Sequence, residues 1–532
     1  MRHPGPDADV ARASEVLPET DAAALRPAPI LDIRRLRPLL RERADLVALV
    51  VITVSAAAVR IATLGLQGLD HDEATTAFGV LQPTFGGTLA AVEHLERTPP
   101  IYYILAWLWT KPLGFGSGAV DLRLLSATFG SLTVPVVYLA ARELATRRAG
   151  VVAAMLVALN PFLVWYSQEA RAYSLLVLLI ALGLYLFVRA LRKPNGRNLG
   201  LWALVSILAL CTHYFAAFVI VAEAIWLLTT TRPRRRTLAA VGAIAAAGGA
   251  LVPLALTQQG SGETDWFSAT PILSRAWQIP VHYMSSVKPE ISATHGWITA
   301  LQISAAAVAV VLACVGVAIL VRLGRPMERR ASVLVAVLAA ASFLIPIVLA
   351  AAGLDFVDAR NLIGSLVLLL VAAGIAFAAA RAAVAGTVAA AVACALFIAM
   401  LVAANQTRQM QRPDWRVDAA VIGTSPLKRV VVVPQSAAPP LSYYLDARDT
   451  DGDGHPVWIR EIELFSRAPT KDGPEWPFTL SSERTVRGRM WIARYEAARP
   501  VRVWLSADRI TRMIGQGASA IVTRPPTASA PQ

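Results

Sequence analysis

The chain has 532 residues, of which 56% are hydrophobic and only 16% are charged, and its formal net charge is +14. This composition is typical of a protein embedded in a membrane and excludes a water-soluble enzyme and a disordered chain. The basic residues lie in short clusters between apolar stretches, which argues against nucleic-acid binding. The three cysteines lie far apart inside apolar runs, so we expect them to be packing residues rather than disulfide partners or metal ligands.

Residues 1–44 predict a disordered cytoplasmic arm with a basic end. A helix needs about 20 apolar residues to cross the hydrocarbon layer, and about eleven stretches within residues 45–403 approach that length. Their approximate limits are 46–64, 120–140, 149–164, 173–191, 199–214, 216–230, 237–256, 297–321, 331–352, 361–380 and 383–403. We therefore predict a mainly α-helical, polytopic membrane protein with about 11 transmembrane helices.

The distribution of arginine predicts the orientation of these spans. Arginine clusters recur in alternate loops, which places those loops and the N-terminus in the cytoplasm. Basic residues on both sides of 199–230 require an even number of spans there, and we expect a hairpin that turns near His213. The loops expected outside the membrane are 65–119, 165–172, 257–296 and 353–360.

The tail, residues 404–532, differs from the apolar part of the chain. Its strand-like run at 429–434 and its alternating stretches near 488–506 predict a small α/β domain. By the parity of the spans, this domain lies outside the cytoplasmic membrane.

The first external loop begins with Asp70-His71-Asp72-Glu73, soon after the first span ends. Three carboxylates at a membrane surface admit three interpretations. They cap the helix that follows, or one of them is a general base that takes a hydroxyl proton. In the third, His71 and the acids bind a divalent metal, although no second cluster supplies further ligands.

A second polar segment, residues 166–173, lies between the third and fourth spans. Its sequence is Tyr166-Ser167-Gln168-Glu169-Ala170-Arg171-Ala172-Tyr173. We expect Arg171 to meet a phosphate and Glu169 or Gln168 to hold sugar hydroxyls; the alternative is a simple ion pair between Glu169 and Arg171. Arg60 lies about one turn below the outer end of the first span, where it needs an anion unless its side chain snorkels to the interface.

Three other positions have two interpretations of equal weight: each either anchors the chain at the membrane interface or lines a site. Tyr102 follows a rigid Pro99-Pro100 bend, and His213 lies at the tip of the expected hairpin. Arg360 lies within Asp358-Ala359-Arg360-Asn361, at the outer end of a later span.

Four motifs in this order resemble glycosyltransferase family 39 of the GT-C superfamily, which includes protein O-mannosyltransferases and aminoarabinose transferases. They are Asp72-Glu73-Ala74, Pro99-Pro100-Ile101-Tyr102-Tyr103, Arg123-Leu124-Leu125-Ser126 and the segment 166–173. The resemblance is strongest over residues 46–230. It continues more weakly through Thr212-His213-Tyr214, residues 358–361 and Arg412-Pro413-Asp414-Trp415-Arg416.

The resemblance implies an enzyme that moves a sugar, mannose-like by family, from a polyprenyl-phosphate donor to a cell-envelope acceptor outside the membrane. One carboxylate base would imply direct displacement with inversion at C1. Asp72 matches the family's acidic position, where a carboxylate is the base, and Glu73 matches its partner. The preceding Asp70-His71 departs from the family pattern. The donor contacts expected are Arg60, Arg171, Glu169, Gln168, Tyr166, Arg123, His213, Arg360 and Tyr102.

The acceptor implied is a glycan, a lipid or a protein, and no cofactor is predicted, with a divalent metal left as an alternative. The rival function is a transporter or flippase of lipid-linked sugars, although no internal repeat is found. A second rival is a non-catalytic envelope protein that binds through its tail, but eleven spans exceed what an anchor needs.

Overall fold

The computed structural model describes residues 33–259, 271–285, 296–449, 456–466, 473–474, 477–486, 490–515 and 517–523. The chain divides into two compact units, Met1–Leu46 and Val47–Gln532. In the first unit the described residues, from 33 onward, are helical and belong to α1 (Ile33–Ile61). Most of the predicted disordered arm lies outside the described residues.

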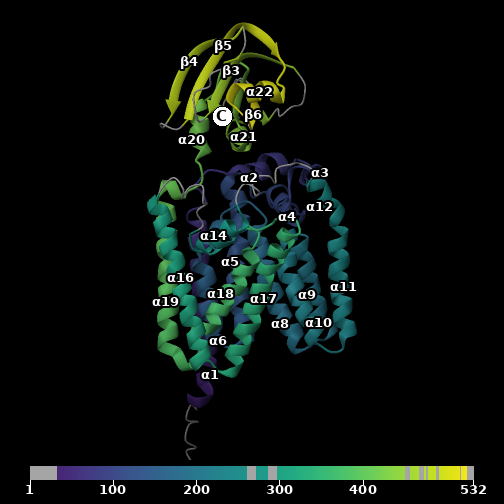
Figure 1. Cartoon of the computed structure of the whole chain (residues 1–532), viewed down its shortest axis with the longest axis vertical. Coiled ribbons are helices and arrows are strands. Elements are labelled where there is room, and N and C mark those ends of the chain that lie inside the picture. Colours follow the sequence, from purple (N-terminus) through teal and green to yellow (C-terminus); the bar gives the residue numbers. More distant parts are fainter. Residues whose placement is uncertain are drawn as a thin grey trace, which may run out of the picture. The chain divides into compact units, whose positions relative to one another are not determined.

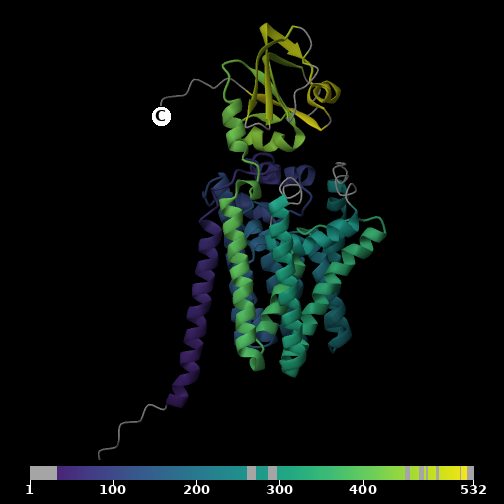
Figure 2. The ribbon, with the colours of Figure 1, turned by 60° about the vertical axis from the view of Figure 1, so that its left-hand side comes forward.

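The second unit is helical through most of its length up to residue 422, and its long helices run side by side in both views (Figure 1 and Figure 2). The long helices are α5 (Ala119–Leu144), α8 (Tyr173–Arg192), α11 (Arg234–Ala250), α16 (Gly296–Leu323), α17 (Pro326–Ala351) and α19 (Ala383–Gln406). The shorter ones are α6 (Arg147–Leu159), α7 (Pro161–Ser167), α9 (Gly196–Leu210), α10 (Ala217–Thr230), α12 (Val252–Gln259), α14 (Ile272–Ser285) and α18 (Ile363–Phe377).

Among the described residues, seven helical segments are long and apolar enough to cross a membrane. The count rises to eight if α6 and α7, bent by 61° at Asn160, form one broken span. The protein is thus a multi-pass membrane protein, but the predicted number of about eleven spans is confirmed only in part. Three of the predicted spans are short apolar helices, Gly196–Leu210, Tyr214–Thr230 and Ile363–Phe377.

Two of these short helices, α9 and α18, end before the predicted spans do, because the apolar runs continue past the helix ends. The run at 199–214 includes Cys211-Thr212-His213, where α9 has already ended and the chain turns into α10. A 15-residue helix such as α9 rises only about 22 Å, less than the roughly 30 Å of a hydrocarbon layer. Apolar length alone therefore overestimates the number of full spans.

The loop predicted to be external, residues 65–119, is folded into helices. It contains α2 (His71–Ala74), a π-helical turn η1 (Thr75–Val80), α3 (Phe85–Leu95) and α4 (Ile101–Thr110). The Pro99-Pro100 bend comes directly before α4, as expected of prolines at a helix start.

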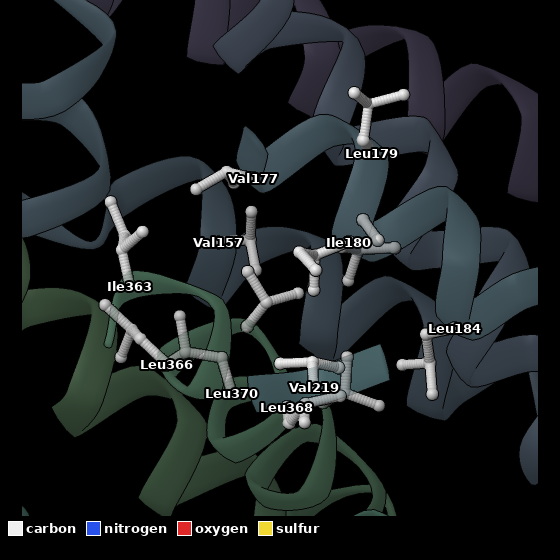
Figure 3. Close-up of a cluster of buried hydrophobic side chains, with 14 of the residues drawn as sticks. Val157, Val177, Leu179, Ile180, Leu184, Val219, Ile363, Leu366, Leu368 and Leu370 are labelled. Atoms are coloured by element: carbon white, nitrogen blue, oxygen red, sulfur yellow. The ribbon is translucent and has the colours of Figure 1, made fainter. Parts of the chain in front are cut away.

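The core of the bundle is made by α5, α6, α8 and α18, which pack on one another. Figure 3 shows part of this core, with aliphatic side chains from α6, α8, α10 and α18 filling the space between the helices. Gly374 of α18 lies so close to α6 that a Cβ atom there would be 2.7 Å from the Cβ of Ala153. A side chain at this position would force the two helices apart.

The tail folds around a six-stranded sheet of order β2-β6-β1-β3-β5-β4. Its strands are β1 (Arg429–Pro434), β2 (Arg448–Asp449), β3 (Val457–Ser466), β4 (Thr479–Val486), β5 (Met490–Val503) and β6 (Ala518–Thr523). β1 pairs in parallel with β3, and the other neighbours are antiparallel. The predicted small α/β domain with strands at 429–434 and near 488–506 is therefore confirmed.

Both faces of the sheet are covered by helices. Val430 and Val432 of β1 face the side of α22 (Ala507–Ile514), whereas Val431 and Val433 face α20 (Trp415–Ile422) and α21 (Ala438–Tyr444), as Figure 2 shows for the helices. Burial on both faces explains why β1 is a continuous run of valines rather than an alternating pattern.

We predict that Gly374→Ala lowers the free energy of unfolding by about 1–3 kcal/mol, because its methyl group overpacks the contact with Ala153. Thermal melting in detergent measures this change. Gly183→Ala in α8 is the matched control, since nothing lies within 4 Å of its Cβ position and alanine favours a helix. Equal melting temperatures for the two variants would contradict the close packing of α6 and α18.

Candidate active site

The turn that carries Asp72 is closed by reciprocal hydrogen bonds at the start of α2. The Asp70 carboxylate accepts a hydrogen bond from the His71 N–H at 2.9 Å, and the Glu73 carboxylate accepts one from the Asp70 N–H at 3.3 Å. This capping box uses two of the three acids. The Asp72 side chain is left 38% exposed.

Glu73 is fully buried and surrounded by donors. Its carboxylate accepts hydrogen bonds from Arg123 Nε at 2.7 Å and Nη2 at 2.5 Å, from Arg412 Nη1 at 3.1 Å and from the Ala170 N–H at 2.9 Å. Burial alone would raise the pKa of Glu73, but the charges of Arg123 and Arg412 and these hydrogen bonds lower it to about 2. Glu73 is therefore ionised at neutral pH, and its burial and low basicity make it a poor proton acceptor for a substrate.

Asp72 faces an arginine from a distant part of the chain. Its Oδ2 lies 3.4 Å from Nη1 of Arg360, which stands in the loop between α17 and α18. Asp358 holds the same guanidinium, with its Oδ1 3.7 Å from Nε, and also accepts a hydrogen bond from the Arg360 N–H at 2.9 Å. The predicted external residues Asp72 and Arg360 thus meet at one place.

Arg171 lies close to the same carboxylate but binds a different acid. Its Nη1 donates to both carboxylate oxygens of Glu96, at 2.5 and 2.6 Å, and lies 3.3 Å from Oγ1 of Thr76. Burial alone would lower the pKa of Arg171, but the charges of Glu96 and Asp72 contribute to raising it well above its usual value. The buried acid that pairs with Arg171 is thus Glu96, whereas Glu169 pairs with Arg412.

Glu96 was missed by the sequence analysis. It lies at the end of α3, three residues before the Pro99-Pro100 bend, in a stretch with an ordinary helical pattern. The only signal in the sequence is an acid placed just before a family motif in a loop predicted to be external.

Arg412, in the linker after α19, joins two buried acids. Besides Glu73, it donates from Nη2 to Glu169 at 2.9 Å and from Nη1 to the carbonyl of Gln168 at 3.2 Å. Its guanidinium also lies over the ring of Trp165, 4.5 Å from the centroid. Glu169, expected to hold sugar hydroxyls, is thus paired with an arginine of this linker.

Arg60 is buried among protein partners. It donates to the carbonyls of Ala158 at 2.8 Å and Val157 at 3.3 Å, where α6 ends, and to Oγ of Ser167 at 3.2 Å. Gln168 also binds α1, since its side-chain amide donates a hydrogen bond to the Arg60 carbonyl at 2.8 Å. Arg60 is buried and does not snorkel to the interface. Its guanidinium donates hydrogen bonds to the carbonyl groups at the end of α6.

The aromatic candidates Tyr102 and Tyr166 have different neighbours. Tyr102 is buried and its hydroxyl lies 3.0 Å from Oγ of Ser126. Tyr166 packs on Tyr173 with ring centroids 4.8 Å apart, and Tyr173 packs on His213 at 5.4 Å. Burial, with added effect from nearby arginines, lowers the pKa of His213 to about 3, so its imidazole is neutral.

The candidate residues therefore form three groups. Asp72, Arg171 and Arg360 lie together with Tyr173 and His213 beside them. The second group surrounds Glu73 and contains Arg123, Arg412, Gln168 and Glu169. A small hollow beside it is lined by Thr63, Leu64, Gln67, Arg123, Trp165, Gln168 and Arg412. The third is Arg60 at the end of α6. In the part of the chain that the structure describes, no three His, Cys, Asp or Glu side chains come together as metal ligands.

Residues 97–257 match the model of the dolichyl-phosphate-mannose-protein mannosyltransferase family. The predicted family is confirmed over this stretch, and with it the enzyme class, a glycosyltransferase that uses a lipid-phosphate sugar. The match determines neither the sugar nor the acceptor. No curated protein matches the sequence.

Among solved structures, ArnT from Cupriavidus metallidurans bound to undecaprenyl phosphate is similar over 84% of this chain and 97% of its own. The identity is 13% and the TM-score 0.53, so the likeness shows a shared fold. The archaeal oligosaccharyltransferase AglB from Archaeoglobus fulgidus matches at 14% identity over 71% of this chain and 58% of its own, with a TM-score of 0.45. The S. cerevisiae Pmt1-Pmt2 O-mannosyltransferase complex matches at 19% identity over 40% and 33%, with a TM-score of 0.33.

We predict that Glu73→Gln lowers the free energy of unfolding by about 3–5 kcal/mol, because Arg123 and Arg412 are left buried without their shared counter-charge. The folded pKa of Glu73, about 2, lies below its ordinary value of roughly 4.3. The stability that its charge contributes is thus present above pH of about 4.3 and is lost as the pH falls towards 2. The melting temperatures of wild type and variant should converge over that interval.

Glu143→Gln provides the control for this prediction. Glu143 also pairs with an arginine, Arg192, but both side chains are at least 36% exposed, so the pair contributes little. If Glu73→Gln melted like Glu143→Gln at neutral pH, the ion pairs around Glu73 would not stabilise the fold.

Proposed function

We propose that the chain transfers a sugar from a polyprenyl-phosphate donor to a cell-envelope acceptor on the outer face of the cytoplasmic membrane. The family matched by residues 97–257 supports mannose or a similar sugar. The undecaprenyl phosphate named for the ArnT structure supports the donor class. The acceptor is a glycan, a lipid or a protein.

The observation that carries this proposal is the contrast between two neighbouring acids. Glu73 is buried and fully bound by Arg123, Arg412 and the Ala170 N–H, whereas Asp72 is 38% exposed and lies beside Arg360. Only Asp72 combines access to a substrate with a fixed position. We therefore assign Asp72 as the base and Glu73 as the residue that orients its turn.

The arginines near Asp72 supply the positive charge that a phosphate requires. Arg171 donates to Glu96 and Thr76 through Nη1, and among the described residues no hydrogen bond from its Nη2 or Nε is found. Those donors suit a phosphate oxygen, which guanidinium groups bind in a bidentate manner. Arg360, 3.4 Å from Asp72, is the second contact with the donor phosphate.

The transfer is a single displacement. The acceptor oxygen attacks C1 of the sugar opposite the phosphate, its proton passes to Asp72, and the bond from C1 to the phosphate oxygen breaks. The electron pair leaves with the polyprenyl phosphate, whose charge Arg171 and Arg360 stabilise. Because phosphate is a weak base, the leaving group needs no strong acid, and one displacement inverts the configuration at C1.

The other candidate residues either support this centre or line it. Arg123 fixes Glu73, and Arg60 fixes the break between α6 and α7, so both are positioning residues rather than phosphate ligands. We place Tyr166, Glu169, Gln168, His213 and Tyr102 around the sugar or behind its contacts. A neutral His213 suits a hydrogen bond to a hydroxyl group better than an ion pair.

We further propose the topology that the arginine clusters favour. The N-terminus is cytoplasmic, and the short helices α9, α10 and α18 complete the set of about eleven spans together with neighbouring helices. The site and the tail, residues 404–532, then lie outside the cytoplasm, where lipid-linked sugars meet envelope acceptors.

Asp72→Asn is expected to fold normally but to lower kcat by about 10² to 10⁴-fold, because the acceptor hydroxyl loses its base. The assay uses purified protein in detergent with a radiolabelled polyprenyl-phosphate sugar and an envelope extract. Release of polyprenyl phosphate together with labelled product measures turnover.

Asp121→Asn is the matched control, since Asp121 is an external acid that caps the start of α5. It should turn over like wild type. Near-wild-type transfer by Asp72→Asn would remove Asp72 from the mechanism. An intact donor that only crosses a vesicle membrane would instead favour a flippase, which leaves the bond to C1 unbroken.

A further inference from the structure

The loop that leads to Asp72 has an unusual set of backbone contacts. The five successive carbonyls of residues 64–68 each accept a hydrogen bond from a guanidinium group. Arg123 donates to Leu64, Gln67 and Gly68 at 2.8 Å each. Arg416 donates to Gly65 at 3.0 Å and to Leu66 at 2.9 Å.

The two arginines come from different parts of the chain. Arg123 belongs to α5 in the helical bundle, whereas Arg416 belongs to α20, the first helix of the tail. Asp414 fixes Arg416 through a contact of 2.8 Å between Oδ1 and Nε. A Cβ atom at Gly68 would lie 3.2 Å from the same Asp414 oxygen, which shows how closely the tail approaches the loop.

A second tail helix holds the end of the same loop. The hydroxyl of Tyr444 in α21 accepts a hydrogen bond from the Leu69 N–H at 2.8 Å. The carbonyl of Ser436 lies 3.3 Å from Nδ1 of His71, and α21 packs against α2 (Figure 1). The tail therefore contacts the chain on both sides of Asp70.

We propose that Asp414, Arg416 and Tyr444 form a clasp through which the tail domain sets the position of Asp72, so that Arg416 and Tyr444 are positioning residues for sugar transfer. This inference rests on the proposed function of Asp72 as the base. It assigns the tail a part in the reaction itself.

The composition of the loop explains why a clasp is needed. Gly65 and Gly68 permit many backbone conformations, and no carbonyl of residues 64–68 belongs to a helix ladder beyond the end of α1. With the clasp absent, Arg123 alone holds three of the five carbonyls. A displacement of a catalytic group by about 1 Å lowers a rate by roughly 10²-fold.

Two variants test the clasp by kinetics. Arg416→Gln removes the donors to Gly65 and Leu66, and Tyr444→Phe removes the acceptor for Leu69. We expect each to lower kcat by about 10- to 100-fold while the KM for a polyprenyl-phosphate sugar stays nearly unchanged, because the donor contacts Arg171 and Arg360 are not altered. Arg416→Lys should restore part of the rate.

The tail offers a matched control for each variant. Arg484 in β4 also donates to a backbone carbonyl, that of Val421, but does not contact the loop. Tyr443 adjoins Tyr444, and its hydroxyl bonds to the backbone of Ala119 instead. Arg484→Gln and Tyr443→Phe should therefore keep the wild-type kcat. Equal losses in the clasp and control variants would overturn the proposal, since they would indicate a general effect of the tail.

Hydrogen exchange gives a second readout that does not depend on activity. In the full-length protein, Arg416→Gln and Tyr444→Phe should speed amide exchange in residues 65–70 and leave exchange in α5 and α8 unchanged. If wild type proved to have no transferase activity, the proposed function would fail while faster exchange in residues 65–70 would still support the clasp. Unchanged exchange in that loop would overturn the clasp whatever the activity.

Discussion

The architecture of the site depends on the buried ion pairs that Glu73 makes with Arg123 and Arg412. These three residues come from the loop 65–119, from α5 and from the linker after α19, and Glu73 and Arg412 are 339 residues apart. A buried charge without its partner is strongly unfavourable, so none of the three segments can move away alone. The position of Asp72 follows from this constraint, because it is the next residue along the same turn.

The two acids of one motif illustrate how environment divides chemical roles. Glu73 is surrounded by guanidinium groups and an amide N–H, which keep it ionised and immobile. Asp72 keeps solvent access and lies beside Arg360, with Arg171 nearby. The pairs of Arg171 with Glu96 and of Arg412 with Glu169 neutralise the remaining charge, so this region of many ionisable groups stays compatible with a membrane surface.

Local sequence patterns predicted the helices and strands, but they did not predict which residues far apart in the chain pair with each other. Apolar length identified the spans, and a run of valines identified the central strand β1, because both signals are carried by consecutive residues. The same signal ran past the ends of α9 and α18, since it does not mark where a helix ends. The motif residues Asp72, Arg171 and Arg360 were found as candidates, but the pairing of Asp72 with Arg360, 288 residues away, depends on the fold. The roles of Glu96 and Arg412 also depend on the fold. Arg60 was expected to bind an anion, but it binds carbonyl groups at the end of a helix, and the sequence does not mark a helix end as a negatively charged group.

The break between α6 and α7 shows how such a partner works. The last carbonyls of α6 carry the negative end of the helix dipole, and Arg60 binds two of them, while Asn160 caps the N–H groups at the start of α7. The cation in this apolar setting is thus balanced by oriented peptide groups, with no carboxylate among its hydrogen-bond partners. Because a straight, continuous helix would use those carbonyls itself, the break between α6 and α7 makes them available to the buried guanidinium of Arg60.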